Sequence, residues 1–282
     1  MFYRDGIVYR SSLLDGFDGI VHGFTSREGG VSTISHLASL NLTRNLGDTD
    51  GNVTANLGIF AKAVSGDTMD ASSLVTAHQI HSVRIRTVGP ENRGEGSLRE
   101  CGEDCDGFVT DRQGVMPVVR TADCVPILLC GTKADGSFVV AAVHAGWRGS
   151  AGGIAGAAVE RMCELGCLRD TVKAAVGTHI RECCYEVRQD FIDAVSEMRD
   201  PGFAARHIRK SGSDGKYRAD LCGMNVEILN GAGVDDSRID ISPFCTACDP
   251  DRFFSHRASG GKRGTMGAGI AIAGTGPADG CP

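Results

Sequence analysis

Apolar and polar positions along the chain follow two periods, one typical of helices and one typical of strands. Val53, Leu57, Phe60 and Val64 recur every three or four residues, which predicts a helix with one buried face. Most of the middle of the chain consists of short apolar runs separated by turn residues, and we expect these runs to form the core of a sheet. They are residues 107–110 (GFVT), 115–121 (VMPVVRT), 125–131 (VPILLCG) and 137–144 (SFVVAAVH).

Two stretches change from strand to helix periodicity. The run that ends at His144 is followed by a predicted helix over residues 150–166, and residues 172–202 contain a similar strand and helix. Asp220 is the predicted N-cap of a further helix that ends at Gly231. No repeat or change of composition marks a boundary, so we expect residues 1–282 to form one α+β domain with mixed sheets and helices.

Residues 74–88 (LVTAHQIHSVRIRTV) alternate in a way that predicts one strand. His78 and His81 are three residues apart, so on a strand they would point to opposite faces. Only one of the two histidines can then serve a given site.

Composition and charge exclude several classes of protein. The net charge of −6 and the absence of a Lys/Arg cluster argue against a nucleic-acid partner. The N-terminal residues lack the apolar core of a signal peptide, and no apolar stretch is long enough to span a membrane. We therefore expect a soluble cytoplasmic protein without a membrane partner.

Twelve cysteines in a cytoplasmic chain are expected to be free thiols, most of them small buried apolar residues. Three pairs are closely spaced, but only the last has the C-x-x-C spacing of a zinc knuckle. That pair lacks a second C-x-x-C pair at a suitable distance, so the sequence does not favour a structural metal there. The pairs are Cys101 and Cys105, Cys163 and Cys167, and Cys245 and Cys248.

The candidate chemistry centres on Cys124, which follows a polar Thr-Ala-Asp stretch between two apolar runs. His144 ends a neighbouring run, and His81 is a third potential ligand. One cysteine and two histidines with an open fourth position match the stoichiometry of a catalytic zinc site. Two alternatives remain open at this point: a Cys124 nucleophile with His144 as its base, and a type-1 copper site.

Several motifs come in the order found in one family. The segments SREGGVS, QIH, TADCVPILL, VAAVHAGWRG, CYEV and FFSHR resemble the YfiH-type family over nearly the whole chain. That family was first labelled multicopper polyphenol oxidase, or laccase domain, and includes zinc-dependent purine nucleoside phosphorylases. The resemblance implies a YfiH-like α+β fold with α/β/β/α layers.

The resemblance also implies the site residues. It assigns zinc, with copper as an alternative metal, to His81, Cys124 and His144, and it gives His78 no role as a ligand. Cys124 and His144, together with Arg148, are then the predicted catalytic residues. The implied contacts to phosphate and substrate are Arg27, Asn41 and Arg148.

The chain departs from the family pattern at four positions: Ser82, Thr178, Arg181 and His256. None of these is a predicted ligand, so the departures concern substrate preference more than the metal. The general acid is not identified by the sequence. Candidates by residue type alone are His179, Glu186 and His256.

The activity implied by the resemblance is phosphorolysis of adenosine, inosine and guanosine, with methylthioadenosine as a further substrate, together with adenosine deamination. A zinc ion lowers the pKa of bound water to about 7, and the hydroxide so formed could attack C6 of a purine. Nucleosides and phosphate are the expected partners of a monomer.

Three alternatives to this activity remain. They are a copper-dependent polyphenol oxidase, a hydrolase or amidase that edits cell-wall precursors through Cys124, and a metal-binding protein without activity. Eight histidines with no H-x-H pair argue against a multicopper cluster.

Overall fold

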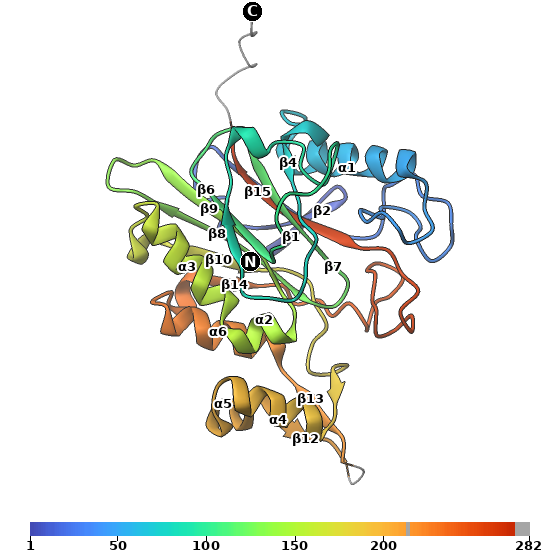
Figure 1. Cartoon of the computed structure of the whole chain (residues 1–282), viewed down its shortest axis with the longest axis vertical. Coiled ribbons are helices and arrows are strands. Elements are labelled where there is room, and N and C mark those ends of the chain that lie inside the picture. The colour runs from blue at the N-terminus through green and yellow to red at the C-terminus, as the bar shows by residue number, and fades with distance from the viewer. Residues whose placement is uncertain (213–214, 274–282) are drawn as a thin grey trace, which may run out of the picture.

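The computed structural model describes residues 1–212 and 215–273, in which two six-stranded sheets pack against each other between layers of helices (Figure 1). Neighbouring strands of the first sheet are antiparallel except for one parallel pair, β4 with β7. In spatial order the strands are β1 (Phe2–Asp5), β2 (Val8–Ser11), β3 (Ile20–Thr25), β15 (Met266–Ile272), β7 (Met116–Thr121) and β4 (Leu74–Val75).

The second sheet carries the hairpin on which the site is built. Strands β8 and β9 are antiparallel, and their register pairs Pro126 with His144 and Val125 with Ala145. Cys124, one residue before β8, therefore lies at the same edge as His144. In spatial order the strands are β14 (Ile239–Ile241), β10 (Lys173–Val176), β8 (Val125–Thr132), β9 (Phe138–Ala145), β6 (Gly107–Thr110) and β5 (Ile85–Thr87).

Apolar side chains fill the space between the two sheets and the space beneath each helical layer. Phe24 and Leu128 belong to the core between the sheets, whereas Phe60 packs a helix on the outer face of the first sheet. Ile154 and Met162 belong to the core beneath the helices of the second sheet. The layers are thus α/β/β/α, and the predicted α+β class is confirmed. The covering helices are α1 (Asp50–Ser65), α2 (Trp147–Gly152), α3 (Ile154–Glu164) and α6 (Leu221–Gly231).

A smaller unit extends from the end of the molecule that carries α2 and α6 (Figure 1). It consists of helices α4 (Gln189–Met198) and α5 (Pro201–His207) and a sheet of β11 (Glu186–Val187), β13 (Tyr217–Ala219) and β12 (Ile208–Lys210). Short 3-10 turns occur at Ala71–Ser73, Pro90–Asn92, Arg169–Thr171 and Asp236–Arg238. In the described part of the chain, no helix combines the length and the apolar character that crossing a membrane would require.

The predicted helices are present. Helix α1 contains the predicted stripe, and the hydroxyl of Thr49 caps it by accepting the Asn52 N–H. Asp220 is the N-cap of α6, since its carboxylate accepts the Gly223 N–H. The helix predicted over residues 150–166 is divided into α2 and α3, because Gly153 adopts a left-handed φ of 89° between them.

The single strand predicted over residues 74–88 is wrong. Its two ends are β4 and β5, which belong to different sheets, and the connection between them is irregular. Backbone N–H groups of this connection bond to a buried carboxylate, Asp106, instead of to a neighbouring strand. His81 takes a left-handed φ of 60°, so the argument from opposite strand faces does not apply. His78 is separated for another reason: it is exposed and pairs with Asp104.

Candidate metal centre and its cavity

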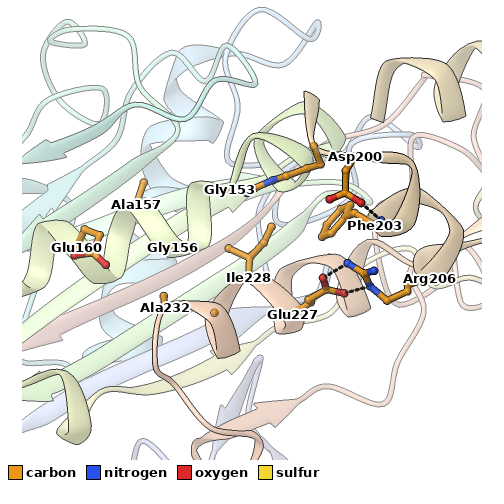
Figure 2. Close-up of a pocket in the computed structure, with 12 residues that line it drawn as sticks. Gly153, Gly156, Ala157, Glu160, Asp200, Phe203, Arg206, Glu227, Ile228 and Ala232 are labelled. Carbon is orange, nitrogen blue, oxygen red and sulfur yellow. Dashed lines mark hydrogen bonds and ion pairs between the residues drawn. The ribbon is translucent and has the colours of Figure 1, made fainter. Parts of the chain in front are cut away.

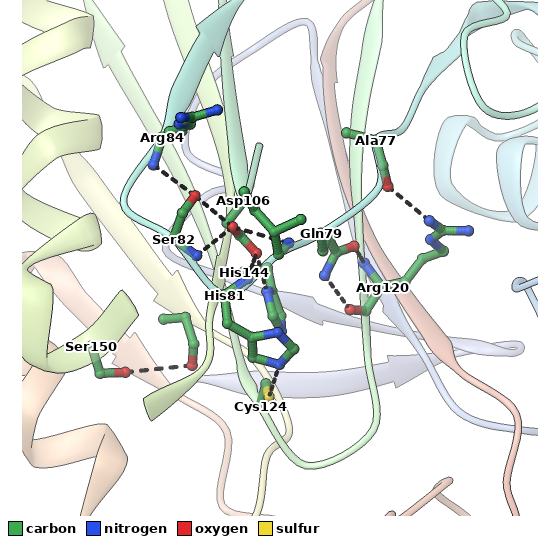
Figure 3. Close-up of polar contacts among 12 residues, drawn as sticks. Ala77, Gln79, His81, Ser82, Arg84, Asp106, Arg120, Cys124, His144 and Ser150 are labelled. Atoms are coloured by element: carbon green, nitrogen blue, oxygen red, sulfur yellow. Dashed lines mark hydrogen bonds and ion pairs between the residues drawn. The ribbon is translucent and has the colours of Figure 1, made fainter. Parts of the chain in front are cut away.

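Three side chains from distant parts of the sequence meet at one edge of the second sheet (Figure 3). Cys124 precedes β8, His144 lies at the end of β9, and His81 comes from the connection between the sheets. Their potential ligand atoms all lie within 4.8 Å of one another, and Cys124 Sγ is 3.9 Å from His81 Nε2. The structure therefore brings together the three residues that the sequence suggested as ligands.

The turn before Cys124 is fixed by hydrogen bonds between Asp123 and three other segments. Asp123 has a φ of 96°, a left-handed conformation that costs roughly 1–3 kcal/mol for a non-glycine residue. Its carboxylate accepts the Thr246 hydroxyl at 2.6 Å and the Arg257 N–H at 2.7 Å, and its carbonyl accepts the Ile180 N–H. These bonds fix the direction in which the Cys124 thiol points. Asp123 was not among the site residues predicted from the sequence.

The buried carboxylate of Asp106 contacts the ring of His144 and the backbone of His81. It accepts His144 Nδ1–H at 2.9 Å and the backbone N–H groups of His81 at 2.9 Å and Ser82 at 2.6 Å. With Nδ1 engaged in this way, His144 offers Nε2 to a metal, as is usual for carboxylate-backed histidine ligands. Burial favours protonation of Asp106, but the hydrogen bonds from His144 and Ser82 outweigh it and lower the pKa to about 2.

Asp106, which contacts two of the candidate ligands, was not among the site residues predicted from the sequence. The only available signal was its position directly before the apolar run 107–110, which becomes β6 beside β9. Ser82, a departure from the family pattern, donates its hydroxyl to Asp106 at 2.7 Å.

The thiol and the imidazole influence each other's protonation. Burial alone would raise the pKa of Cys124, but the charge of His144 and hydrogen bonds with His144 and His81 lower it to about 6. Burial would lower the pKa of His144, but the Cys124 charge and the bond to Asp106 raise it to about 9. At neutral pH these shifts favour a thiolate beside a protonated His144. A metal ion that displaces the Nε2 proton of His144 would then meet a thiolate and two imidazoles, a donor set that suits zinc or copper.

A cavity of about 190 Å³ opens beside these donors. Arg148 lines it with its guanidinium stacked on the Trp147 ring, 4.2 Å from the ring centroid. Arg148 lies within the first turn of α2, rather than before a helix as predicted. The lining residues are His81, Asp123, Cys124, Trp147, Arg148, Ile180, Tyr185 and Leu221.

The structure does not bring Arg27 and Asn41 to this cavity. Arg27 lines a separate cavity of about 230 Å³ and donates to the carbonyls of Ala38 and Pro250, both at 2.8 Å. Asn41 is fully buried, and its amide donates to the Thr43 carbonyl. Their side chains thus make structural contacts within the described chain.

The residues proposed by type as acids also lie outside the cavity lining. His179 is fully buried and its Nδ1 pairs with the Gly177 carbonyl, whereas His256 is exposed and Glu186 pairs with Lys216. Two departures from the family pattern make local contacts. Thr178 Oγ1 bonds to the Ser242 hydroxyl, and Arg181 donates to backbone carbonyls near Ser242.

A larger cavity, of about 450 Å³, lies among α3, α5 and α6 (Figure 2). It is lined by small residues such as Gly156 and by the ion pair of Arg206 with Glu227. No thiol or imidazole is among the lining residues that the structure describes there. The smaller cavity is therefore the candidate site, because it is lined by the thiol of Cys124 and the imidazole of His81, although its volume is less.

The two layered sheets and the donor set at the edge of the second sheet define an α+β protein with a candidate metal centre open to a cavity. The model of one family, described as multi-copper polyphenol oxidoreductase laccase, matches residues 21–273. The chain belongs to this family.

Relatives of the chain carry two activities in their names. The chain is 34% identical over 257 residues to the purine nucleoside phosphorylase YlmD of Geobacillus stearothermophilus, with 89% of each chain covered. It is 36% identical over 209 residues to the adenosine deaminase RL5 of an unknown prokaryotic organism, covering 72% of this chain and 76% of the relative. The crystal structure of YfiH from Bacillus licheniformis superposes with a TM-score of 0.85 at 30% identity, covering 96% and 98% of the two chains.

Proposed function

We propose that the chain is a zinc-dependent purine nucleoside phosphorylase with adenosine deaminase activity. The observation that carries the proposal is the convergence of His81, Cys124 and His144 on one point beside a cavity. Relatives at 34% and 36% identity are named for these two activities. Adenosine, inosine and guanosine are the proposed nucleosides, with methylthioadenosine as a further substrate.

The three donors fit a zinc ion, which would be held by His81 Nε2, Cys124 Sγ and His144 Nε2. When bound, the ion would supply a Lewis acid next to the substrate. The Asp106 carboxylate accepts the Nδ1–H of His144, which orients the ring and keeps this proton on Nδ1. The donor geometry is therefore set by the protein before substrate binds.

Arg148 is the proposed phosphate ligand. A guanidinium matches two phosphate oxygens at once, and stacking on Trp147 restricts its position in the cavity. Tyr185 and Leu221 supply ring and apolar surface for the nucleoside. Phosphorolysis needs phosphate beside the sugar as the base leaves, and the position of Arg148 in the lining of the same cavity as His81 and Cys124 supports this assignment.

One observation favours a second candidate. The lowered pKa of Cys124 next to His81 and His144 is also what a cysteine nucleophile needs in a hydrolase or amidase. A copper oxidase is a third candidate from the family description, with the same donors. Metal dependence and phosphate dependence separate these activities.

The test combines metal analysis with assays of inosine and adenosine. We expect zinc in the purified protein, hypoxanthine release from inosine only with phosphate, and ammonia release from adenosine. Cys124→Ser should abolish both activities, whereas Cys101→Ser, which changes an exposed thiol elsewhere, should retain them. Phosphate-independent cleavage, or an active Cys124→Ser protein, would overturn the proposal. Phenol oxidation that requires copper would favour the oxidase.

A further inference from the structure

A second group of thiols lies outside the candidate metal centre. Cys183 and Cys184 come from the segment after β10, and Cys245 and Cys248 form the C-x-x-C pair after β14. The four sulfur atoms all lie within 4.8 Å of one another. The partner pair that the C-x-x-C motif lacked in the sequence is thus two adjacent cysteines about 60 residues earlier.

The sulfur atoms are close enough together to share one tetrahedral metal ion. Cys248 Sγ is 3.3 Å from Cys184 Sγ and 3.5 Å from Cys183 Sγ, and the latter two are 3.8 Å apart. Zinc–sulfur bonds of about 2.3 Å with tetrahedral angles separate the sulfur atoms by about 3.8 Å. The Arg181 N–H points to Cys245 Sγ at 3.4 Å, a bond that stabilises a thiolate ligand.

We propose that Cys183, Cys184, Cys245 and Cys248 bind one structural zinc ion, separate from the centre at Cys124. Four thiolates without an open position are the donor set of structural zinc sites. Cys183 and Cys248 are exposed, so an ion reaches the cluster from solvent, whereas Cys245 is buried at the base of the site. The proposal does not depend on the proposed activity.

The position of the cluster indicates what the ion does. The backbones of the two cysteine segments meet at one isolated β-bridge, His179 with Cys245. In this bridge the Thr246 N–H donates to the His179 carbonyl. These same segments hold the turn before Cys124, since Thr246 and Ile180 both bond to Asp123. A bound zinc ion would fasten the two segments and so fix one wall of the cavity.

The experiment counts zinc in protein purified under reducing conditions. We expect two zinc ions per wild-type chain, and one in a Cys124→Ser/His144→Ala variant that keeps only the four-cysteine cluster. X-ray absorption of that variant should show four sulfur neighbours at about 2.3 Å. Cys183→Ser/Cys248→Ser should also hold one zinc, and Cys101→Ser, the matched control on another exposed thiol, should hold two.

Two results would overturn the proposal. One is a Cys124→Ser/His144→Ala protein that is folded by circular dichroism yet contains no zinc or shows nitrogen neighbours. The other is a disulfide between Cys183 or Cys184 and Cys248, found by mass spectrometry after the free thiols of the native protein are alkylated and without a later reduction step. Because the Cys124→Ser/His144→Ala variant leaves the four-cysteine cluster intact, its absorption spectrum decides the question even where the Cys183→Ser/Cys248→Ser variant does not fold. Loss of phosphorolysis alone would concern the other centre.

Discussion

At the scale of single residues, the site depends on side chains that contact the donors as much as on the donors themselves. His81, Cys124 and His144 could be predicted from the sequence, because their residue types are those of metal ligands and the motifs around them resemble those of one family. Asp106 could not, because its role exists only once the fold has brought β6 beside β9.

Replacing Asp106 by Asn tests this second set of contacts. His144 Nδ1–H and three backbone N–H groups converge on the carboxylate, and an amide turns an NH₂ group toward one of these donors. We expect zinc affinity to fall about 10- to 100-fold, as is typical when a carboxylate behind a histidine ligand is lost. Competition with a chromophoric chelator measures the zinc affinity of the variant and of the wild type. Asp104→Asn, at an exposed carboxylate nearby, should bind zinc normally.

Gly146 illustrates a close approach to a donor. A Cβ placed on this residue would lie 2.5 Å from His81 Cδ2, so Gly146→Ala must displace the His81 ring. We expect weaker metal binding and lower activity with little change in thermal stability. The control is Gly231→Ala, where an added Cβ meets nothing within 4 Å. Equal zinc affinity of the two variants would contradict the placement of His81.

At the scale of elements, periodicity predicted the strands and helices with a continuous apolar face, but not the segment between β4 and β5. Val83, Ile85 and Thr87 alternate as in a strand, yet only Ile85–Thr87 pairs with a neighbour. The preceding backbone is bound to Asp106, a contact with no local signature. For the same reason, the sequence did not reveal that Cys183 and Cys184 lie beside Cys248.

The contact between α5 and α6 should be sensitive to acid. Hydrogen bonds from Arg206, with a smaller contribution from His207, lower the pKa of Glu227 from 4.5 to about 2, against the effect of burial. A carboxylate with a lowered folded-state pKa stabilises the protein above its ordinary pKa, and this contribution disappears as pH falls from 4.5 towards 2.

Urea unfolding as a function of pH checks this expectation. At neutral pH, Glu227→Gln should be less stable than wild type, and the difference should shrink below pH 4.5. Because the ion pairs are partly exposed, we expect a modest difference. Glu164→Gln, at an exposed i,i+3 pair on α3, is the matched control and should change little. A gap between wild type and Glu227→Gln that stays constant with pH would be inconsistent with this role.

At the scale of the whole molecule, the two sheets share one core and both contribute to the site's support. The number and periodicity of the apolar runs were enough to expect strands and covering helices. Their order in space was not, because pairing partners such as β3 and β15 are separated by almost the entire chain. We expect residues 1–282 to unfold in a single transition and to migrate as a monomer in size-exclusion chromatography.

Close packing between the first sheet and α1 should make β15 intolerant of added volume. A Cβ on Gly267 would lie 2.6 Å from Leu42 and 2.7 Å from Phe60, so we expect Gly267→Ala to destabilise the protein by about 1–3 kcal/mol. Gly58→Ala, on an open face of α1, should instead stabilise it by up to about 1 kcal/mol. Thermal unfolding compares the melting temperatures of the two variants. An equal shift of the melting temperature for both would argue against this packing.

The place of β15 between β3 and β7 also governs how the chain is made. During translation β1, β2 and β3 leave the ribosome first. Strand β15, which pairs with β3, emerges only after residues 266–272 have been synthesised. Until then the edges of β3 and β7 expose unpaired backbone groups, which nascent chains protect by binding chaperones. Synthesis that stops before Met266 should therefore yield a chain prone to aggregation, although every ligand of both thiol-containing centres has already been translated.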